Sequence, residues 1–447
     1  MKIIQVPFCF YPDPVGGTEV YVEALSRYLQ QQSVEVIVAA PGETSQSYLH
    51  HQLPVRRYGM SKQLKNLREN YGEGDIHAAI EFSRLLDAEQ PDIVHLHALT
   101  SGVSLRIVQA AKQRKIPVVF TYHTPTVTCQ RGTLMRWGTQ ICDGQIDLHA
   151  CTQCTLQGLG LDKNIAKAIA NLPTQVGKWL GDLNLQGRTW TALRMTELVS
   201  LRHTTLRTLL AEVNHIVAVC NWVRDVLLLN HVPQDKITVI RQGLCHNLPE
   251  TINSQPRYAK STLKIAFLGR LDPTKGIHIL IKALQVVPNL PINLDIYGVS
   301  QGASGSAYQQ QLQTITANDQ RISFKPPVAP ENVISTLTDY DLLAVPSQWL
   351  ETGPMVVLEA FAAGVPVIGS NLGGIAELVQ HEVNGILVEP ASVVAWSQQL
   401  QRLCQDRQLL MRLGAGIKSP QTMEAVATQM LSIYQLYANG DLFSKPI

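Results

Sequence analysis

Short apolar runs alternate with longer mixed segments along most of the chain. In the first half the apolar runs are KIIQV, VEVIVAA, DIVHLH, PVVFTYH, HIVAVC and ITVIRQG. Several are almost continuous in Val and Ile, which is typical of parallel strands covered by helices on both faces. Most of the segments between them have a helical pattern. The first half therefore predicts βαβ units with right-handed crossovers in a doubly wound parallel sheet.

The pattern starts again in the second half, with KIAFLGR, INLDIYG, ISFKPP, DLLAVPS, PVIGS and GILVEP. A polar, proline-containing stretch separates the two series and indicates a linker. Ligands of open α/β sheets bind beyond the carboxyl ends of the strands, so we expect two domains facing across a cleft that holds the site. The predicted parts are a Rossmann-like domain at 1–245, a linker at 246–262, a second Rossmann-like domain at 263–425, and a helix at 426–447 that packs back on the first domain.

One region, from about 124 to 210, interrupts this rhythm, because it contains no clear strand. Its second part carries two tryptophans and six cations: Lys167, Lys178, Arg188, Arg194, Arg202 and Arg207. One interpretation is a helical insert packed on the first domain. The other is a basic, aromatic-containing helix that lies on an anionic membrane surface, which would make the protein peripheral at the inner face of the membrane.

Composition limits the classes of function. The 447 residues exceed what one hydrophobic core usually supports, and a formal net charge of +2 argues against nucleic acid as a partner. The first apolar run is broken by Pro7, Pro12 and Asp13, unlike a signal peptide, and no run of 18 apolar residues predicts a membrane span. These features indicate a cytoplasmic enzyme or binding protein.

Two basic residues follow the first strand of the second series, in GRLDPTKG. Arg270 ends the strand and Lys275 precedes the next helix. Two fixed cations at the carboxyl end of a strand suit a diphosphate, since Arg binds it through two hydrogen bonds and Lys acts as a point charge. The alternative is a solvated loop with two surface cations.

Two glutamates, Glu351 and Glu359, flank a predicted helix start in WLETGPMVVLEAFAAG. Pro354 suits the first turn of that helix and Gly364 its end. The main-chain N–H groups of Gly353, Met355 and Val356 would form an anion site at the helix N-terminus. One carboxylate could then face a sugar and the other a ribose, with a diphosphate between them. The alternative is that both glutamates are ordinary loop and surface residues.

Taken together, these motifs resemble glycosyltransferase family 4, whose members are retaining enzymes with the GT-B fold. The resemblance rests on Glu-x7-Glu after PS, on GRL…KG upstream, on GVPVIGSNLGGIAELV downstream and on PVGGTEVYVEAL near the N-terminus. It implies that Arg270 and Lys275 bind the donor diphosphate, that Glu351 lies beside the donor sugar and that Glu359 binds the ribose. It also implies that Pro354, Met355 and Val356 meet the sugar and phosphate through main-chain groups.

The resemblance extends to the first domain and to the nucleotide base. His123, in TYHTP, matches the family's active-site histidine, and Gly16 and Gly17 match its glycine loop. The base would lie near Gly298 and Lys325. The chain departs from the family where RQGLC replaces the commoner Asn-Gly-Val-Asp, and where LETGPMV replaces Glu-Gly-Phe-Gly-Leu.

The implied function is transfer of a sugar from a nucleotide diphosphate sugar to a glycan, lipid-linked or small-molecule acceptor, in cell-envelope or exopolysaccharide biosynthesis. Fixed cations can take the place of a divalent metal, so no cofactor is expected for the chemistry. Two alternatives share the fold: a nucleotide-sugar 2-epimerase, and a non-catalytic protein that binds nucleotide sugars.

A cysteine cluster follows the strand-end histidine. Cys129, Cys142, Cys151 and Cys154 have the spacing C-x12-C-x8-C-x2-C. Four thiolates that include one C-x2-C pair suit tetrahedral zinc, which indicates a structural zinc site. The alternatives are separate free thiols or a redox pair.

Overall fold

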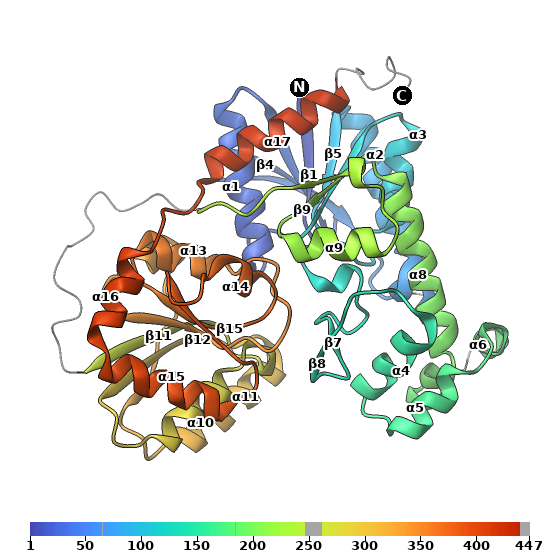
Figure 1. The fold of residues 1–447 in the computed structure, drawn as a ribbon. Helices are drawn as coiled ribbons and strands as arrows, with labels where there is room; N and C mark the ends of the chain where they lie inside the picture. Colours follow the sequence, from blue (N-terminus) through green and yellow to red (C-terminus); the bar gives the residue numbers. More distant parts are fainter. Residues whose placement is uncertain (65, 184, 246–261, 439–447) are drawn as a thin grey trace. The chain divides into compact units, whose positions relative to one another are not determined.

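The computed structural model describes residues 1–64, 66–183, 185–245 and 262–438. The chain divides into two compact units (Figure 1). The first unit consists of Met1–Arg241 together with the segment from Met423 on, and the second is Gln242–Thr422. The division thus falls just before the predicted linker, which lies outside the described residues except for Thr262.

The first unit is built on a sheet with the order β10-β9-β6-β5-β1-β2-β4-β3, eight strands in the described residues. Its pairs are parallel except β3 with β4, which is antiparallel. The strands are β1 (Lys2–Val6), β2 (Glu35–Gly42), β3 (Gln46–His50), β4 (Leu53–Gly59), β5 (Ile93–Leu96), β6 (Val118–Tyr122), β9 (His215–Ala218) and β10 (Ile237–Val239).

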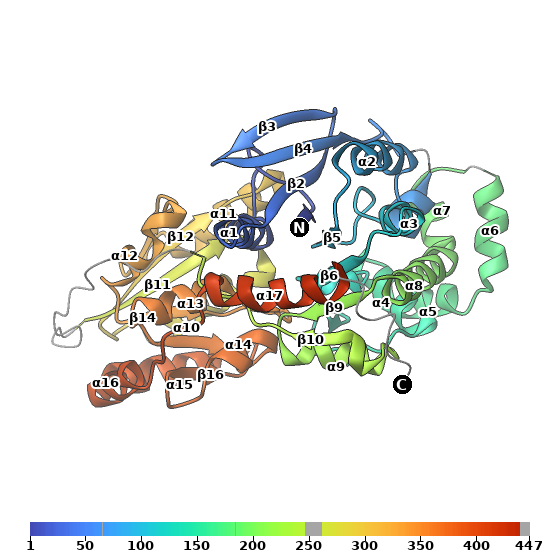
Figure 2. The same cartoon turned by 90° about the horizontal axis from the view of Figure 1, so that it is seen from above.

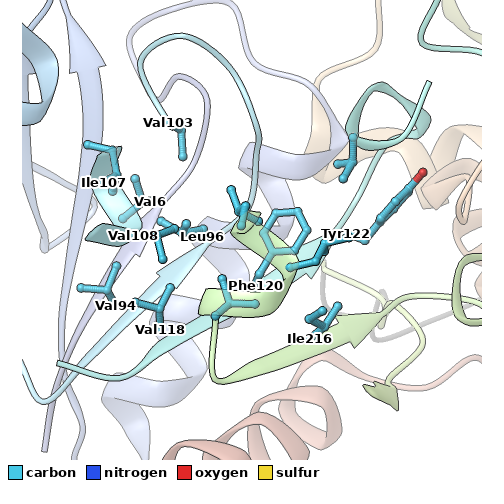
Figure 3. Close-up of a cluster of buried hydrophobic side chains, with 14 of the residues drawn as sticks. Val6, Val94, Leu96, Val103, Ile107, Val108, Val118, Phe120, Tyr122 and Ile216 are labelled. Carbon is cyan, nitrogen blue, oxygen red and sulfur yellow. The ribbon is translucent and has the colours of Figure 1, made fainter. Parts of the chain in front are cut away.

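Each apolar run predicted in the first half forms a strand, which confirms the α/β class, but the sequence pattern missed the β3–β4 hairpin. The buried side chains of the parallel strands form the centre of the core (Figure 3). Val94 and Leu96 of β5 and Val118 and Phe120 of β6 have no exposed surface. Burial on both faces explains why these strands are continuous in apolar residues.

The helices of this unit outside the insert are α1 (Gly17–Gln31), α2 (Ile76–Glu89), α3 (Leu105–Gln113), α9 (Asn221–Leu229) and α17 (Met423–Ala438). Helix α17 comes from the far end of the chain and packs on α1, as the red and blue helices in Figure 1 show. Its buried side chains include Met423, Val426, Met430 and Tyr434.

The insert is helical, with α4 (Leu148–Gly158), α5 (Lys163–Ala170), α6 (Thr174–Asp182), α7 (Arg188–Leu193) and α8 (Met195–Glu212). Asp147 and Asp162 cap α4 and α5 through their carboxylates. Helices α4, α5 and α6 gather around α8 (Figure 2). The expectation that the insert has no strand was wrong in one detail, because β7 (Met135–Arg136) and β8 (Gln140–Ile141) form a small hairpin there.

The second unit has a sheet with the order β13-β12-β11-β14-β15-β16, six strands in the described residues and all paired in parallel. These are the six runs predicted in the second half: β11 (Leu263–Arg270), β12 (Ile292–Val299), β13 (Ile322–Lys325), β14 (Leu342–Val345), β15 (Val367–Ser370) and β16 (Gly385–Val388). Its helices are α10 (Ile277–Val286), α11 (Gly302–Thr316), α12 (Val333–Leu337), α13 (Met355–Ala362), α14 (Gly373–Leu378), α15 (Val393–Gln405) and α16 (Arg407–Ala415).

The second unit is therefore also a doubly wound α/β domain, with its two largest buried clusters formed by the sheet and its helices. In the described part of the chain, no helix is both long enough and apolar enough to cross a membrane.

Candidate active site

A charged cluster of three residues, Lys275, Ser347 and Glu351, lies at the carboxyl ends of β11 and β14 in the second unit. Lys275 Nζ is 2.6 Å from Glu351 Oε1, and the Ser347 hydroxyl donates to the same oxygen at 2.6 Å. The Lys275 ammonium also lies 5.4 Å from the centre of the Trp349 ring, within cation–π range. The structure thus brings together two residues that the sequence placed 76 positions apart.

Glycine makes this close approach of loops possible. Gly276 has a left-handed φ of 70°, and a Cβ there would lie 1.8 Å from the carbonyl oxygen of Pro346. The Gln348 N–H donates to the carbonyl of Thr274 at 2.6 Å, which joins the lysine loop to the glutamate loop. A side chain at position 276 would therefore push these two loops apart.

Glu351 is held as a carboxylate. Only 6% of the residue is exposed, and this burial acts to raise the pKa of Glu351. The charge of Lys275 and the hydrogen bonds from Lys275 and Ser347 outweigh burial, so its pKa lies below the usual value. The cluster therefore holds a fixed ammonium and a fixed carboxylate, both largely removed from water.

Glu359 behaves in the opposite way. It lies on α13, one turn and a half beyond Pro354, which occupies the N-cap position rather than the first turn. Burial raises the pKa of Glu359 to about 7. The two glutamates of Glu-x7-Glu thus differ in charge near neutral pH, because only Glu351 has a cation beside it. Met355 and Val356 form the first turn of α13, and Gly353 precedes it.

Arg270 ends β11, and Gly298 is the next-to-last residue of the neighbouring strand β12; Arg270 is paired with Val299 and Gly298 with Gly269. Arg270 is exposed, and its guanidinium is 3.5 Å from the side-chain oxygen of Gln301. A Cβ at Gly298 would lie 2.5 Å from Leu271, so packing alone requires glycine there. Arg270 is therefore accessible to a ligand. The glycine at position 298 is explained by its packing against Leu271, without any ligand.

His123 directly follows β6 in the first unit and belongs to a buried histidine network, which consists of Gln5, His95, His97, Thr121, His123 and Tyr434. His97 Nδ1 is 2.9 Å from His123 Nε2, and His97 Nε2 is 2.6 Å from Gln5 Oε1. The Gln5 amide donates to the Tyr434 hydroxyl at 3.3 Å. His95 connects that hydroxyl with Thr121, at 2.7 Å on each side.

These contacts define which nitrogen of His123 carries the proton. Gln5 Oε1 only accepts hydrogen bonds, so His97 Nε2 donates to it and His97 Nδ1 accepts. His123 Nε2 then donates to His97 Nδ1, and His123 Nδ1 is the basic nitrogen. Burial lowers the pKa of His123 to about 3 and that of His97 well below its ordinary value. Both rings are neutral at neutral pH.

Gly16 and Gly17 lie at the start of α1, where Gly16 is the N-cap. The Gly16 N–H donates to the Glu19 carboxylate at 2.9 Å. A Cβ at Gly16 would come no closer than 3.4 Å to a neighbour, the end of the Glu19 side chain. Packing within the described structure therefore does not itself require glycine at this position.

The predicted cysteines also come together, since Cys129, Cys142, Cys151 and Cys154 line one small cavity in the insert. Lys325, expected near the base, ends β13 at the edge of the sheet and is 3.5 Å from Asp295 in an ion pair.

Sequence reasoning missed Ser347, Gln5 and Tyr434. Ser347 stands in the quoted PS motif, so its proximity to Glu351 could have been inferred from the strand end. No local pattern connects Tyr434 with His95, which is 339 residues away.

Two α/β units of this kind, with a buried ion pair at the strand ends of the second, define a protein of the GT-B class. Two family models match the chain: "Glycosyl transferases group 1" over residues 250–419 and "Glycosyltransferase Family 4" over residues 15–151. The chain belongs to the group 1 glycosyltransferases of family 4.

Curated relatives include the D-inositol 3-phosphate glycosyltransferase of Nocardia farcinica, 29% identical over 46% of this chain and 48% of the relative. The enzyme of the same name from Corynebacterium glutamicum is 32% identical over 39% of this chain and 43% of the relative. The chain thus spans about half the length of the curated relatives it matches.

Solved structures with the same fold cover nearly the whole chain. A sucrose-phosphate synthase from Thermosynechococcus elongatus has a TM-score of 0.68 at 18% identity, covering 98% of this chain and 99% of that one. HepE of Anabaena, in complex with UDP and glucose, has a TM-score of 0.59 at 17% identity, covering 100% of both chains. At these identities the likeness establishes the fold.

Proposed function

We propose that this protein is a retaining glycosyltransferase that moves a sugar from a nucleotide diphosphate sugar to an acceptor hydroxyl. The observation that carries the proposal is the charged cluster, in which a half-buried lysine and a buried carboxylate precede the N-terminus of α13. These groups lie at the ends of parallel strands, where ligands of such sheets bind. The cation and the helix N-terminus suit a diphosphate, and the fixed anion suits the sugar attached to it.

In the proposed reaction the bond between the sugar C1 and the diphosphate oxygen breaks, and negative charge develops on the leaving group. Lys275 and Arg270 would stabilise that charge together with main-chain N–H groups of Met355 and Val356. Since these groups are fixed before the reaction, they need no reorganisation as the charge appears. Glu351 would lie beside the sugar, where a carboxylate favours the positive charge that grows near C1.

Glu359 would bind the ribose. Two ribose hydroxyls donate hydrogen bonds well to a carboxylate and poorly to a protonated carboxyl group. With a pKa of about 7 in the empty protein, Glu359 would lose its proton when the nucleotide binds.

His123 would contact a sugar hydroxyl. Its neutral ring has a basic Nδ1, which accepts a hydrogen bond from a hydroxyl without placing a charge near the sugar. Gly16 and Gly17 would let the backbone of α1 approach the donor or acceptor.

Nucleotides bound in structures with the same fold support the nature of the donor. HepE binds UDP and glucose, and a starch synthase of Arabidopsis thaliana with the same fold binds ADP. A nucleotide diphosphate sugar is therefore the donor class to test, with the base left open between uracil, adenine and guanine.

The acceptor would be a glycan, a lipid-linked sugar or a small molecule, in envelope or exopolysaccharide synthesis. The relatives' names add inositol phosphates to the compounds worth testing. Contact with a membrane through the insert would depend on the other four of the six cations, because Arg194 is paired with Glu197 and Arg202 donates to the carbonyl of Thr126.

Thermal melting with UDP, GDP and ADP tests the donor site. At 100 times its Kd, the correct nucleotide should stabilise the protein by about 2.7 kcal/mol. Arg270→Ala should weaken this shift, whereas Lys282→Ala, at an exposed position of α10, should leave it unchanged. No shift with any nucleotide would contradict a nucleotide-sugar donor.

Product analysis separates the alternatives. A transferase gives a glycoside and free nucleotide only when acceptor is present, and NMR of that product should show the anomeric configuration of the donor. An epimerase would change the sugar without an acceptor, and a non-catalytic protein would bind the donor and leave it intact.

A further inference from the structure

Half of the chain's eight cysteines surround one cavity of about 40 Å³ in the first unit. They come from three segments. Cys129 follows a short 3-10 turn at Pro125–Val127, Cys142 follows β8, and Cys151 and Cys154 lie three residues apart on α4. Residues at this spacing share one face of a helix, so both α4 thiols can face the same point.

The hairpin β7–β8 brings the second segment to the cavity. Its turn uses Trp137 and Gly138 in left-handed conformations, with φ of 54° and 81°. The Cys142 N–H donates to the carbonyl of Leu134 at 2.9 Å, which places Cys142 against the start of the hairpin. The four sulfur-bearing residues are therefore assembled by the fold of the insert and not by sequence proximity alone.

One main-chain N–H group already contacts a sulfur atom of this cluster. The Trp137 N–H points to Cys154 Sγ at 3.2 Å, and sulfur accepts such a hydrogen bond best as a thiolate. Arg131 and Arg136 line the same cavity, and Arg136 is paired with Asp143, whose carboxylate lies 3.7 Å from Cys142 Sγ. Four thiolates around a divalent ion carry a net charge of −2, and the guanidinium of Arg131 offsets part of that charge.

The character of the ligands selects the ion. Four sulfur ligands with no oxygen ligand exclude the hard cations Ca²⁺ and Mg²⁺ and suit zinc in a closed, tetrahedral site. All four are free thiols in the structure.

The four cysteines line one cavity, but no three of their sulfur atoms lie within 4.8 Å of one another. Among the described residues, the only three candidate ligands whose atoms lie within 4.8 Å of one another are Glu23, His50 and His51. In a tetrahedral site with Zn–S bonds of about 2.3 Å, the sulfur atoms are about 3.8 Å apart. Binding would thus draw the cysteines inward, into the cavity that they line.

We propose that Cys129, Cys142, Cys151 and Cys154 bind one structural zinc ion, which ties the segment after His123 to α4. The segment is already held before Cys129, because the Tyr122 hydroxyl is 2.6 Å from Thr128 Oγ1 and Arg202 donates to the carbonyl of Thr126. The metal fixes its far end at Cys129. The site stands independently of the glycosyltransferase proposal, since it rests on residues that have no part in the chemistry.

The test is the metal content of the full chain, purified without a histidine tag and exchanged into metal-free buffer. Wild type should hold about one zinc per chain. Cys151→Ser combined with Cys154→Ser should hold less than roughly 0.2, because two ligands cannot keep a structural zinc. The matched control is Cys404→Ser, a partly buried thiol on α15 in the second unit, which should keep its zinc.

A second measurement keeps the test valid if the double variant does not fold. Wild type treated with a thiol-modifying reagent should release its zinc in step with modification, and Co²⁺ exchanged into the site should give the strong charge-transfer bands of thiolate ligands. Zinc removal by a chelator should also speed proteolysis between residues 124 and 160.

Three results would overturn the proposal. The first is that the wild-type protein neither contains zinc nor binds it when zinc is supplied. The second is that any two of the four cysteines form a disulfide. The third is that the protein contains iron and shows the visible absorption of an iron–sulfur cluster.

Discussion

The two α/β units bury polar groups at their strand ends in opposite ways. The second unit buries full charges, with Lys275 and Glu351 2.6 Å apart. The first unit buries a chain of uncharged groups, in which His95, His97 and His123 all have lowered pKa values because of burial. Similar sheets therefore support two different electrostatic environments.

This difference corresponds to two kinds of recognition. A preorganised cation can stabilise the charge of a leaving diphosphate, whereas neutral imidazoles can only orient hydroxyl groups. A neutral network also costs less to bury than an ion pair, since no charge has to leave water. In the proposed reaction, the second unit would therefore stabilise the charge of the leaving group, and the first unit would orient the hydroxyl groups of the sugar.

The largest effect is expected from removing the cation of the charged cluster. Lys275→Ala should lower kcat/KM by about 10²–10³, the loss typical of one preorganised group that stabilises developing charge. It should also destabilise the second unit by about 3 kcal/mol, because Glu351 is left buried without its partner. Steady-state kinetics and denaturant unfolding measure the two effects.

The double variant Lys275→Ala with Glu351→Gln sharpens this test. Removing both charges should restore much of the stability and none of the activity. If activity returned with stability, the ion pair would be structural only, and the charged cluster would lose its proposed role.

A smaller effect is expected in the histidine network. Tyr434→Phe removes the hydroxyl that contacts His95 at 2.7 Å and Gln5 at 3.3 Å, so two buried groups lose a partner. The cost should be about 1–3 kcal/mol of unfolding free energy. We also expect a lower kcat, because Gln5 holds His97 and His97 holds His123.

Tyr437→Phe is the matched control for this effect. Tyr437 lies one turn further along α17, and its hydroxyl contacts Asn214 and His215 instead. It should lose stability with little change in kcat. Equal changes in kcat for the two variants would show that the network does not position His123.

The smallest effect concerns Glu359. If the nucleotide binds its carboxylate form, affinity should rise with pH through about 7 and differ roughly tenfold between pH 6 and pH 8. Glu359→Gln should remove this part of the pH dependence and leave only that of the phosphates. Calorimetric titration across this range measures it, and an unchanged slope in the variant would contradict the ribose assignment.

The unfolding stability of the empty protein gives an independent check on the same group. Because the pKa of Glu359 is raised by folding, its protonated form contributes to the unfolding free energy. This contribution is fully present below about pH 4.5 and is lost as the pH rises through about 7. At pH 8 the glutamine variant should therefore be more stable than wild type.

The sequence predicted the parts of the fold that depend on local pattern. Runs such as DIVHLH and PVVFTYH became β5 and β6 because a strand buried on both faces needs continuous apolar residues. The β3–β4 hairpin was missed because the edge strand β3, QSYLH, is short and mostly polar, and LPVRRYG beside it mixes charged and apolar residues.

The candidate site was likewise only partly predictable from the sequence. Lys275 and Glu351 could be placed at strand ends from the sequence, but their contact depends on Gly276 letting two loops meet. The opposite pKa shifts of Glu351 and Glu359 follow from burial and from one neighbouring ammonium, neither of which a motif contains.

Helix α17 has a consequence for how the protein is made. The first unit contains Met1–Arg241 but also needs α17, which a ribosome synthesises only after the whole second unit. At about 5–20 residues per second, Tyr434 emerges roughly 17–70 seconds after His95, which lies 339 residues earlier. During this interval the second unit can fold, while the first lacks the hydroxyl that joins Gln5 to His95. The part of the protein made first is thus the part completed last.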